Sequence, residues 1–316
     1  MKSAKMPKKE LYFIFQTLDC GGAEKSILEL IKLLSNKEKY QINILYFKKV
    51  NDLSDEIPIS VKKLHLKSPS WIELFNKLYI DQLSSRKKRI YITALDVPIL
   101  ILLITKILTF KKSKVVILTR CALKGSLKGS NFIKKLIIKS TRRFIYPFAN
   151  YCISNSRYAY EELIKRKLIN KGNLSYIPNI VDIEKYETLS KKNINFPNKY
   201  SPFILCLGNV NERKNYPLAI ESFSKISDKH QSLNLLIVGA IQSKKEFSVL
   251  KKLIKKYSLN SRVFLLGYQK NPLPIIKKCE FLLHTSFSEG FPNAVLQAIS
   301  LQKSVLNTTC CGDGKY

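Results

Sequence analysis

The sequence predicts an α/β protein built from two doubly wound parallel-sheet domains. Short apolar runs alternate along the chain with stretches of helical periodicity, a pattern typical of β-α-β units. The chain has 316 residues, of which 45% are hydrophobic, and this is enough for two cores. Around residues 189–202 the periodicity stops and two prolines appear, and beyond them the alternation starts again. We therefore expect a first domain at 1–190, a linker at about 189–202 and a second domain at 203–316.

In the first domain, the run at 11–15 is apolar throughout and is therefore expected in the middle of a parallel sheet. The helix after it is predicted from Ile27, Ile31 and Leu34, which share one helical face. Further strands are predicted at 42–47, 90–95, 115–119 and 151–154, and further helices at 72–83, 97–108, 132–148 and 157–167.

Residues 90–110 resemble a membrane span, but Asp96, Pro98 and Lys106 divide them. A charged residue in the middle of a bilayer is costly, so a buried strand followed by a buried helix explains the segment better. Residues 1–10 are charged, and the apolar run after them is too short for a signal peptide.

In the second domain, apolar runs predict strands at 203–207, 234–238, 263–266, 281–283 and 304–308. Helical patterns at 219–226 and 247–254 lie between the first three of them. The second domain thus repeats the α/β alternation of the first.

The net charge of +32 comes mostly from lysines spread along the whole chain. A strongly basic surface attracts anionic lipid head groups, at roughly 1 kcal/mol per well-placed lysine, and binds polyanions without sequence preference. No zinc finger, aromatic RNA-binding motif or basic-zipper heptad is present, so no specific nucleic-acid partner is expected. Anionic membrane lipid is therefore the better-supported partner.

Cysteine and histidine are sparse and scattered. The seven cysteines form no Cys-x-x-Cys pair, which indicates reduced thiols in the cytosol. The three histidines have no metal-ligand spacing. His284 ends a buried run, and we expect a buried, capped side chain there rather than a catalytic base, because no orienting carboxylate is evident.

Two glycine-containing loops follow predicted strands. Gly21 and Gly22 precede a helix, where backbone N–H groups can face a phosphate or a sugar. Gly208 opens a loop that carries Arg213 and Lys214. A cation beside a leaving diphosphate stabilises the state in which its bond breaks, although either side chain could also be one more exposed base.

The stretch at 281–300 combines a buried strand, a loop of small residues and a helix. Gly290 allows a ligand to approach the backbone, and Pro292 suits the first position of a helix. The free amides of that helix would open toward the end of the strand and form an anion site with Glu289 at its opening. A loop carboxylate without a ligand is the alternative for Glu289.

The motif Ser288-Glu-Gly-Phe-Pro-Asn293, with Gln297 eight residues after Glu289, resembles the sugar-nucleotide signature of the GT-B glycosyltransferases of family four, also called glycosyltransferase group 1. Gly-Gly-Ala-Glu at 21–24 and Ile-Pro-Asn-Ile-Val-Asp at 177–182 also resemble segments of that family. The resemblance implies two Rossmann-like domains facing across a cleft. Because family members continue beyond residue 316 to a helix that crosses back, we expect the second domain to be incomplete.

The resemblance also implies roles for single residues. Glu289 would reach the donor sugar, and Gln297 would hold the ribose, where the family has glutamate. Lys214 stands at the family's lysine, whereas Asn209 stands where an arginine is usual, and Arg213 could replace that arginine. The remaining donor-binding positions implied are Gly21, Gly22, Gly208, Gly290, Phe291, Pro292, Asn293 and Ala294.

The function implied is retaining transfer of a sugar from a nucleotide-diphosphate sugar to a hydroxyl of a cell-surface polysaccharide or lipid-linked glycan precursor. Side chains and helix ends would neutralise the diphosphate, so no metal or other cofactor is expected. A cytoplasmic enzyme held at the inner face of the membrane would fit such an acceptor. The alternatives are an inactive member that binds nucleotide or a partner at the membrane, and a basic protein that binds polyanions.

Overall fold

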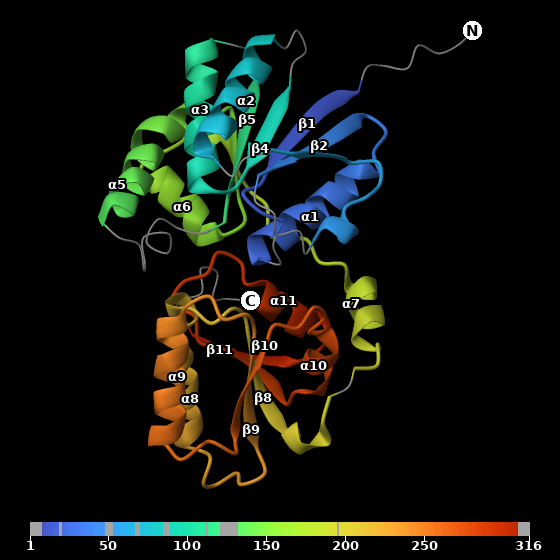
Figure 1. Ribbon diagram of the computed structural model, residues 1–316, viewed down its shortest axis with the longest axis vertical. Helices are drawn as coiled ribbons and strands as arrows, with labels where there is room; N and C mark the ends of the chain where they lie inside the picture. Colours follow the sequence, from blue (N-terminus) through green and yellow to red (C-terminus); the bar gives the residue numbers. More distant parts are fainter. Residues whose placement is uncertain are drawn as a thin grey trace, which may run out of the picture. The chain divides into compact units, whose positions relative to one another are not determined.

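The computed structural model describes residues 8–18, 21–47, 53–66, 70–84, 89–110, 113–120, 132–194 and 196–308. The chain divides into two compact units, Met1–Ile180 and Val181–Tyr316. Each unit is a parallel sheet with helices packed on both faces (Figure 1). The predicted class of two doubly wound α/β domains is confirmed.

The sheet of the first unit has the order β3-β2-β1-β4-β5-β6-β7, and its strands pair in parallel. The predicted central strand is indeed β1, and the order reverses between β1 and β4. The edge strands β3 and β7 were not predicted, because they are short and partly exposed and so lack an apolar run. The bounds are β1 (Lys9–Ile14), β2 (Tyr40–Tyr46), β3 (Lys62–His65), β4 (Ile90–Thr93), β5 (Lys114–Thr119), β6 (Tyr151–Ser154) and β7 (Leu174–Tyr176).

Helices cover the two faces of this sheet with separate cores. One core contains α1 (Gly22–Ser35), and the other contains α2 (Trp71–Ser84), α3 (Asp96–Thr109) and α6 (Arg157–Lys165). Short 3₁₀ turns lie at Ser54–Glu56 and Lys171–Asn173. The segment that resembles a membrane span forms β4 and α3, and none of the helices described in the structure is long and apolar enough to cross a membrane.

Residues 132–148, predicted as one helix, form three pieces. Helix α5 (Phe132–Ser140) continues into a π turn, η2 (Thr141–Ile145), and then into a 3₁₀ turn, η3 (Tyr146–Phe148). Pro147 lies in η3, and a proline disrupts the regular α-helical hydrogen bonds of the turn before it. The segment is anchored by the buried Arg142 and Tyr146, and Arg142 lies 3.5 Å from Asp96 of α3.

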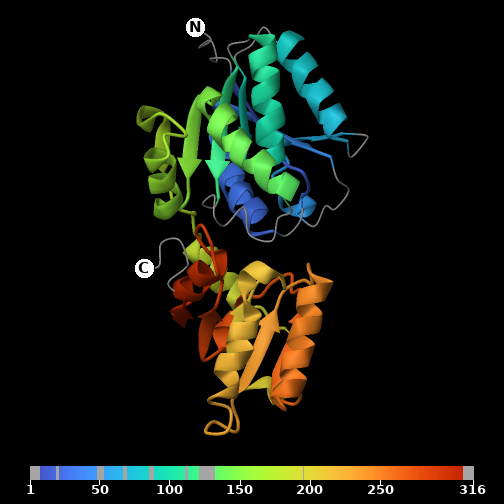
Figure 2. The same ribbon diagram turned by 90° about the vertical axis from the view of Figure 1, so that its left-hand side faces the viewer.

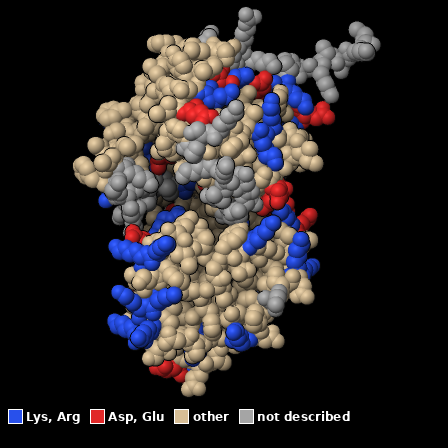
Figure 3. All heavy atoms as spheres, viewed as in Figure 1, with Lys and Arg blue, Asp and Glu red and all other residues tan. Residues whose placement is uncertain are grey.

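The sheet of the second unit has the order β10-β9-β8-β11-β12, again parallel, with a reversal between β8 and β11. Helices α8 and α9 cover one face, and α7, α10 and α11 cover the other. Basic side chains gather along the side formed by α9, which carries six lysines (Figure 3). The bounds are β8 (Phe203–Leu207), β9 (Asn234–Val238), β10 (Val263–Gly267), β11 (Phe281–His284), β12 (Ser304–Asn307), α7 (Ile183–Ser190), α8 (Tyr216–Ser224), α9 (Lys244–Lys256), α10 (Leu273–Lys278) and α11 (Asn293–Ser300), with 3₁₀ turns at Asn198–Tyr200 and Glu212–Lys214.

The stretch predicted as a linker, 189–202, lies within the second unit. Phe196 and Tyr200 pack in the core of that unit, with ring centroids 5.4 Å from Phe203 and 4.8 Å from Phe264, respectively. The boundary between the units therefore falls earlier than expected, between residues 180 and 181. Two half-buried aromatic side chains thus attach this mostly exposed segment to the second unit.

Candidate functional site

The loop that follows β8 holds Lys214 against its own backbone. Gly208 has φ +142°, a conformation that L side chains rarely adopt, and a Cβ there would lie 2.5 Å from Cε of Lys214. The Asn211 side chain accepts a hydrogen bond from the Lys214 backbone N–H at 3.3 Å, and the Tyr216 hydroxyl donates to the Gly208 carbonyl at 2.6 Å. Glycine at 208 is therefore favoured mainly by this backbone conformation, and the lysine side chain also occupies the space beside it.

Asn209 has a structural contact of its own. Its side-chain oxygen accepts a hydrogen bond from the Ala240 N–H at 3.2 Å, which ties the loop after β8 to the loop after β9. Gly239, which sequence reasoning missed, has φ +157°, and a Cβ there would collide with the Gly208 carbonyl. These contacts fix the first residues of the loop. Asn209 is therefore used in packing, and the positive side chains of the loop are Arg213 and Lys214.

The loop that follows β11 is hydrogen-bonded to the loop after β8. The Thr285 hydroxyl donates to the Lys214 carbonyl at 3.0 Å, and the Phe287 N–H donates to the Arg213 carbonyl at 2.9 Å. Strands β8 and β11 are neighbours at the point where the strand order reverses, which is where open α/β sheets bind ligands. The two loops therefore meet at the carboxyl ends of the central strands.

Glu289 is held by two cations at this point. Its Oε1 lies 2.9 Å from Nζ of Lys214, and its Oε2 lies 2.9 Å from a terminal nitrogen of Arg213. The Ser286 hydroxyl donates to Oε1 at 3.1 Å. The side chains of Glu289 and Lys214 are only 9% and 11% exposed, whereas that of Arg213 is 43% exposed. The three predicted catalytic residues thus form one cluster, with Arg213 on its solvent side.

The charges in this cluster control its protonation. Burial by itself would raise the pKa of Glu289, but the positive charges of Lys214 and Arg213 outweigh burial and hold the pKa at about 2. Burial, followed by the charge of Lys214, lowers the pKa of His284 to about 3. His284 is therefore neutral, and it is buried as expected. The expected capping contact is not found at its Nε2, which has no hydrogen-bond partner among the residues the structure describes.

Helix α11 begins directly after the Glu289 loop. Its first residue is Asn293, and Pro292 is the capping residue, one position earlier than the sequence predicts. Val295 and Ala298 face the core, and the half-buried Gln297 lies one turn after Asn293. The structure therefore places Gly290 and Phe291 in the loop after Glu289, and Ala294 in the first turn of α11.

Gly21 and Gly22, by contrast, belong to the first unit. Gly21 caps α1, and the Glu24 carboxylate folds back so closely that a Cβ on Gly21 would collide with it. The preceding Asp19 and Cys20, which sequence reasoning included in this loop, lie outside the described residues.

A second polar cluster, which the sequence did not predict, lies in the first unit. The side-chain oxygen of Asn179 accepts hydrogen bonds from Arg120 at 2.8 Å and from Asn155 at 3.0 Å. Arg120 Nε and Asn155 Oδ1 are buried and have no partner within the described part of the chain. Burial lowers the pKa of Arg120 to about 10, and Glu24 acts in the opposite direction. The available signal was that each residue closely follows a strand at the same sheet edge.

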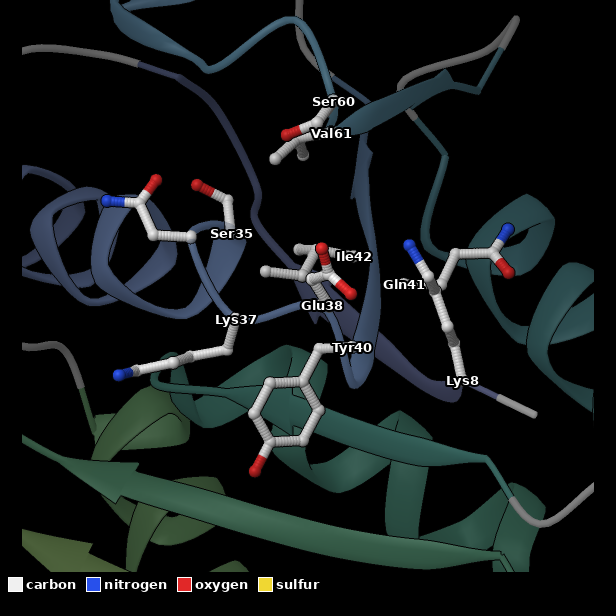
Figure 4. Close-up of a pocket in the computed structure, with 10 residues that line it drawn as sticks. Lys8, Ser35, Lys37, Glu38, Tyr40, Gln41, Ile42, Ser60 and Val61 are labelled. Carbon is white, nitrogen blue, oxygen red and sulfur yellow. The ribbon is translucent and has the colours of Figure 1, made fainter. Parts of the chain in front are cut away.

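A cavity of about 360 Å³ lies elsewhere in the first unit (Figure 4). Its lining includes Lys8, which precedes β1, and Tyr40, which begins β2, so it is at the amino ends of these strands. Ligands of open parallel sheets bind at the carboxyl ends. This cavity is therefore not a candidate for the functional site.

Two parallel α/β units, each with its strand order reversing at the centre, define the GT-B fold. Residues 188–315, which include the whole Glu289 cluster, match the family model "Glycosyl transferases group 1". The family match thus falls on the second unit, and the chain as a whole is a glycosyltransferase with the GT-B fold.

Individual relatives agree with this assignment. The chain is 26% identical, over 95% of its length and 80% of the relative's, to the N-acetylgalactosamine-N,N'-diacetylbacillosaminyl-diphospho-undecaprenol 4-alpha-N-acetylgalactosaminyltransferase of Campylobacter jejuni. It is 26% identical to the capsular polysaccharide biosynthesis glycosyltransferase CapH of Staphylococcus aureus, over 90% of this chain and 77% of CapH. The structure of HepE from Anabaena in complex with UDP and glucose has the same fold, with a TM-score of 0.73 at 16% identity over 96% of this chain and 82% of HepE.

Proposed function

We propose that this chain is a retaining glycosyltransferase that moves a sugar from a nucleotide-diphosphate sugar to a hydroxyl of a lipid-linked glycan or cell-surface polysaccharide precursor. Three relatives from Campylobacter jejuni are named for transfer to saccharides on diphospho-undecaprenol. CapH is named for capsular polysaccharide biosynthesis. These names support a lipid-linked acceptor, and the UDP and glucose bound to HepE support a nucleotide-sugar donor.

The observation that carries the proposal is Glu289 held between Lys214 and Arg213. A donor diphosphate, with about two negative charges before the bond breaks and three after, is a stronger ligand for both cations than one carboxylate. When diphosphate oxygens take over Lys214 and Arg213, the Glu289 carboxylate becomes able to accept hydrogen bonds from the sugar hydroxyls. Because its pKa is held low by its neighbours, Glu289 is ionised and is an acceptor throughout the neutral range.

In the proposed reaction, the bond between the sugar C1 and the diphosphate oxygen breaks, and the electron pair stays on that oxygen. The acceptor hydroxyl oxygen bonds to C1 from the same face, and its proton leaves with the diphosphate. Lys214 and Arg213 stabilise the developing charge, together with the backbone amides of Asn293 and Ala294. Gln297 would hydrogen-bond the ribose. Side chains and amides carry this neutralisation, so the proposal requires no metal ion.

A nucleotide-sugar screen by thermal shift tests donor binding first. A bound donor should raise the melting temperature in proportion to its occupancy, and a nucleoside monophosphate is the matched control because it lacks the diphosphate. Stabilisation by no nucleoside diphosphate would overturn the proposal.

The second test is release of nucleoside diphosphate in the presence of a polyprenyl-diphosphate saccharide. We expect release that depends on the acceptor, and a product with the anomeric configuration of the donor by NMR. Donor binding without any turnover would instead support an inactive nucleotide-binding member. A product of inverted configuration would contradict the retaining mechanism.

A lipid-linked acceptor is anchored in a bilayer. We therefore propose that the chain works in the cytoplasm at the inner face of the membrane, held there peripherally. Fractionation of cells that express the protein, with a salt wash of the membrane pellet, tests this: a membrane-bound, salt-released protein is expected.

A further inference from the structure

One continuous segment of the first unit, residues 132–148, exposes several large apolar side chains. They come from α5 and the turns η2 and η3, and they are between 43% and 79% exposed. Figure 2, viewed from this side, shows α5 on the outside of the first unit. We call this the α5 surface, and its members are Phe132, Ile133, Leu136, Ile137, Phe144 and Phe148.

The α5 surface is more than a scatter of exposed residues. Single exposed apolar side chains are normal, but contiguous ones mark a place that something else covers. Phe132, Ile133, Leu136 and Ile137 lie on one side of α5, since their positions span less than half of a helical turn's circumference. Within α5, Ile138 is the buried hydrophobic side chain that faces the unit. The helix thus presents most of its apolar character outward.

The segment is anchored well enough to hold this orientation. Arg142 and Tyr146 are buried, and Nζ of Lys106 on α3 donates to the Phe148 carbonyl at 2.9 Å and to the Asn150 side chain at 2.7 Å. The π turn and the 3₁₀ turn place Phe144 and Phe148 at the surface while these neighbours stay inside. The outward apolar face is therefore a property of the folded unit.

The sequence around this segment carries charge of one sign. Between Asp96 and Glu161 the sequence contains thirteen lysines and arginines and no acidic residue. The exposed Lys135 and Lys139 lie four residues apart, along one edge of the apolar face of α5, and Arg143 is exposed in the turn that follows. An apolar face flanked by long basic side chains matches a bilayer with anionic head groups, because the stems cover hydrocarbon while the charges reach the phosphates.

Helix α2 also exposes apolar side chains, but basic side chains do not flank them as they do on α5. It exposes Ile72 and Ile80 at 72% and 62%, about as much as the side chains of α5. However, α2 carries the acidic Glu73 and Asp81 and a single lysine. Its charge does not complement an anionic lipid surface.

We propose that the α5 surface is a membrane-docking surface that inserts its apolar side chains into the head-group region of an anionic lipid bilayer. This inference deepens the proposed function, since it rests on an acceptor that is reached at a membrane, and it names the part of the chain that makes the contact. Basic side chains attract the surface to the bilayer, and burial of the apolar side chains retains it there.

Flotation of the full chain with vesicles tests the inference. One set of vesicles is phosphatidylcholine alone, and the other contains phosphatidylglycerol as well. We expect strong binding to the second set that weakens as salt is added. The triple variant Phe132→Ser, Ile133→Ser, Leu136→Ser should bind at least about tenfold less, because it loses the inserted side chains. The pair Lys135→Gln, Lys139→Gln should lose about fivefold per lysine at low salt.

The matched control is Ile72→Ser, Ile80→Ser, which removes equally exposed apolar side chains from α2 and should bind as the wild type does. Circular dichroism confirms that each variant folds. Wild-type binding by the triple variant, or an equal loss in the control, would overturn the inference, as would a wild type that binds neither vesicle. A further outcome would also overturn it: a wild type that binds no vesicles but forms a dimer in sedimentation velocity, when the triple variant is a monomer. That result would assign the surface to a second copy of the chain.

The vesicle assay contains neither donor nor acceptor, so it is independent of the chemistry. A chain that docks through α5 but transfers no sugar would overturn the proposed function and keep this inference. A chain that transfers sugar to a detergent-solubilised acceptor but does not bind vesicles would keep the proposed function and overturn this inference.

Discussion

The two sheets of this protein reverse their strand order in the same way, but the polar side chains that follow their strands are paired differently. In the second unit, Glu289 is paired with Lys214 and Arg213, and each charge has an opposite charge at 2.9 Å. In the first unit, Arg120 and Asn155 share the oxygen of Asn179, and each keeps a buried atom without a partner in the described residues.

This difference separates a cluster that the fold depends on from one that it merely tolerates. A buried ion pair that loses one member leaves an uncompensated charge, which is costly. In the first unit, removal of Arg120 leaves the Asn179 oxygen still bonded to Asn155, so no acceptor loses its last partner. We therefore expect changes in the second unit to have large effects and changes in the cluster of the first unit to have small ones.

The largest effect is expected from Lys214→Met. The change removes the buried cation beside Glu289 and, in the proposed mechanism, a charge that stabilises the leaving diphosphate. We expect sugar transfer to slow by about 10²–10³-fold, as measured by kcat with saturating donor. Lys225→Met, at an exposed lysine just after α8, is the control and should retain full activity. Equal rates for the two variants would show that Lys214 only supports the fold.

Gly208→Ala tests the packing of Lys214 against the backbone. The new Cβ would lie 2.5 Å from Cε of Lys214, and the alanine would have to adopt φ +142°. We expect the free energy of unfolding of the second unit to fall by about 2–4 kcal/mol in urea titrations.

Gly172→Ala in the first unit is its counterpart, since the nearest atom to a new Cβ there is 3.9 Å away. It should be neutral or slightly stabilising. If Gly208→Ala were equally harmless, the close approach of Lys214 would not be a constraint of the fold.

The third prediction concerns pH. Burial lowers the pKa of His284 to about 3, so between that value and its ordinary 6.5 the unfolded chain binds a proton that the folded chain does not. Stability should therefore fall by roughly 2 kcal/mol between pH 7 and pH 5 on account of this group. Below about pH 4.5, stability falls further on account of Glu289. Its pKa is held at about 2 in the folded chain, so between pH 4.5 and pH 2 the unfolded chain binds a proton that the folded chain does not.

His284→Leu should flatten the stability curve between pH 7 and pH 5, as measured by urea unfolding across that range. His230→Asn, at an exposed histidine, should keep the wild-type slope. A His284→Leu curve that remains as steep as the wild type would assign the pH dependence to other groups.

Arg120→Met is expected to have the smallest effect. The guanidinium shares its acceptor on Asn179 with Asn155, which remains bonded when Arg120 is removed. We expect the free energy of unfolding to change by less than about 1 kcal/mol, as measured by urea titration. A loss as large as that of Gly208→Ala would contradict the contrast between the two clusters.

Much of the fold could be predicted because the central strands are buried on both faces. Runs such as 11–15 and 203–207 have no polar face, so their sequence alone indicates a strand in the interior of a parallel sheet. The edge strands β3 and β7 escaped prediction, since a partly exposed strand of three or four residues has no distinctive pattern. Phe196 and Tyr200 stand in a polar stretch, so the sequence predicted a linker where the structure has part of the second unit.

The candidate site could be predicted in part. Lys214 and Glu289 follow buried strands at positions where parallel sheets bind ligands, and the sequence is enough to select them. The hydrogen bond that ties Asn209 to Ala240 could not be read from the chain, because it depends on the neighbouring loop. Arg120, Asn155 and Asn179 were missed because they are 24 to 59 residues apart and no spacing links them.

By itself the sequence determined the alternation of buried strands and helices, the glycine that follows β8 and the acidic residue in the loop after β11. These follow from local patterns of hydrophobicity and backbone freedom. Only the tertiary structure decided that Arg213 and Lys214 meet Glu289, since strand pairing brings together loops 71 residues apart. It also decided that the apolar side of α5 faces outward, because helical periodicity defines a face but not what covers it.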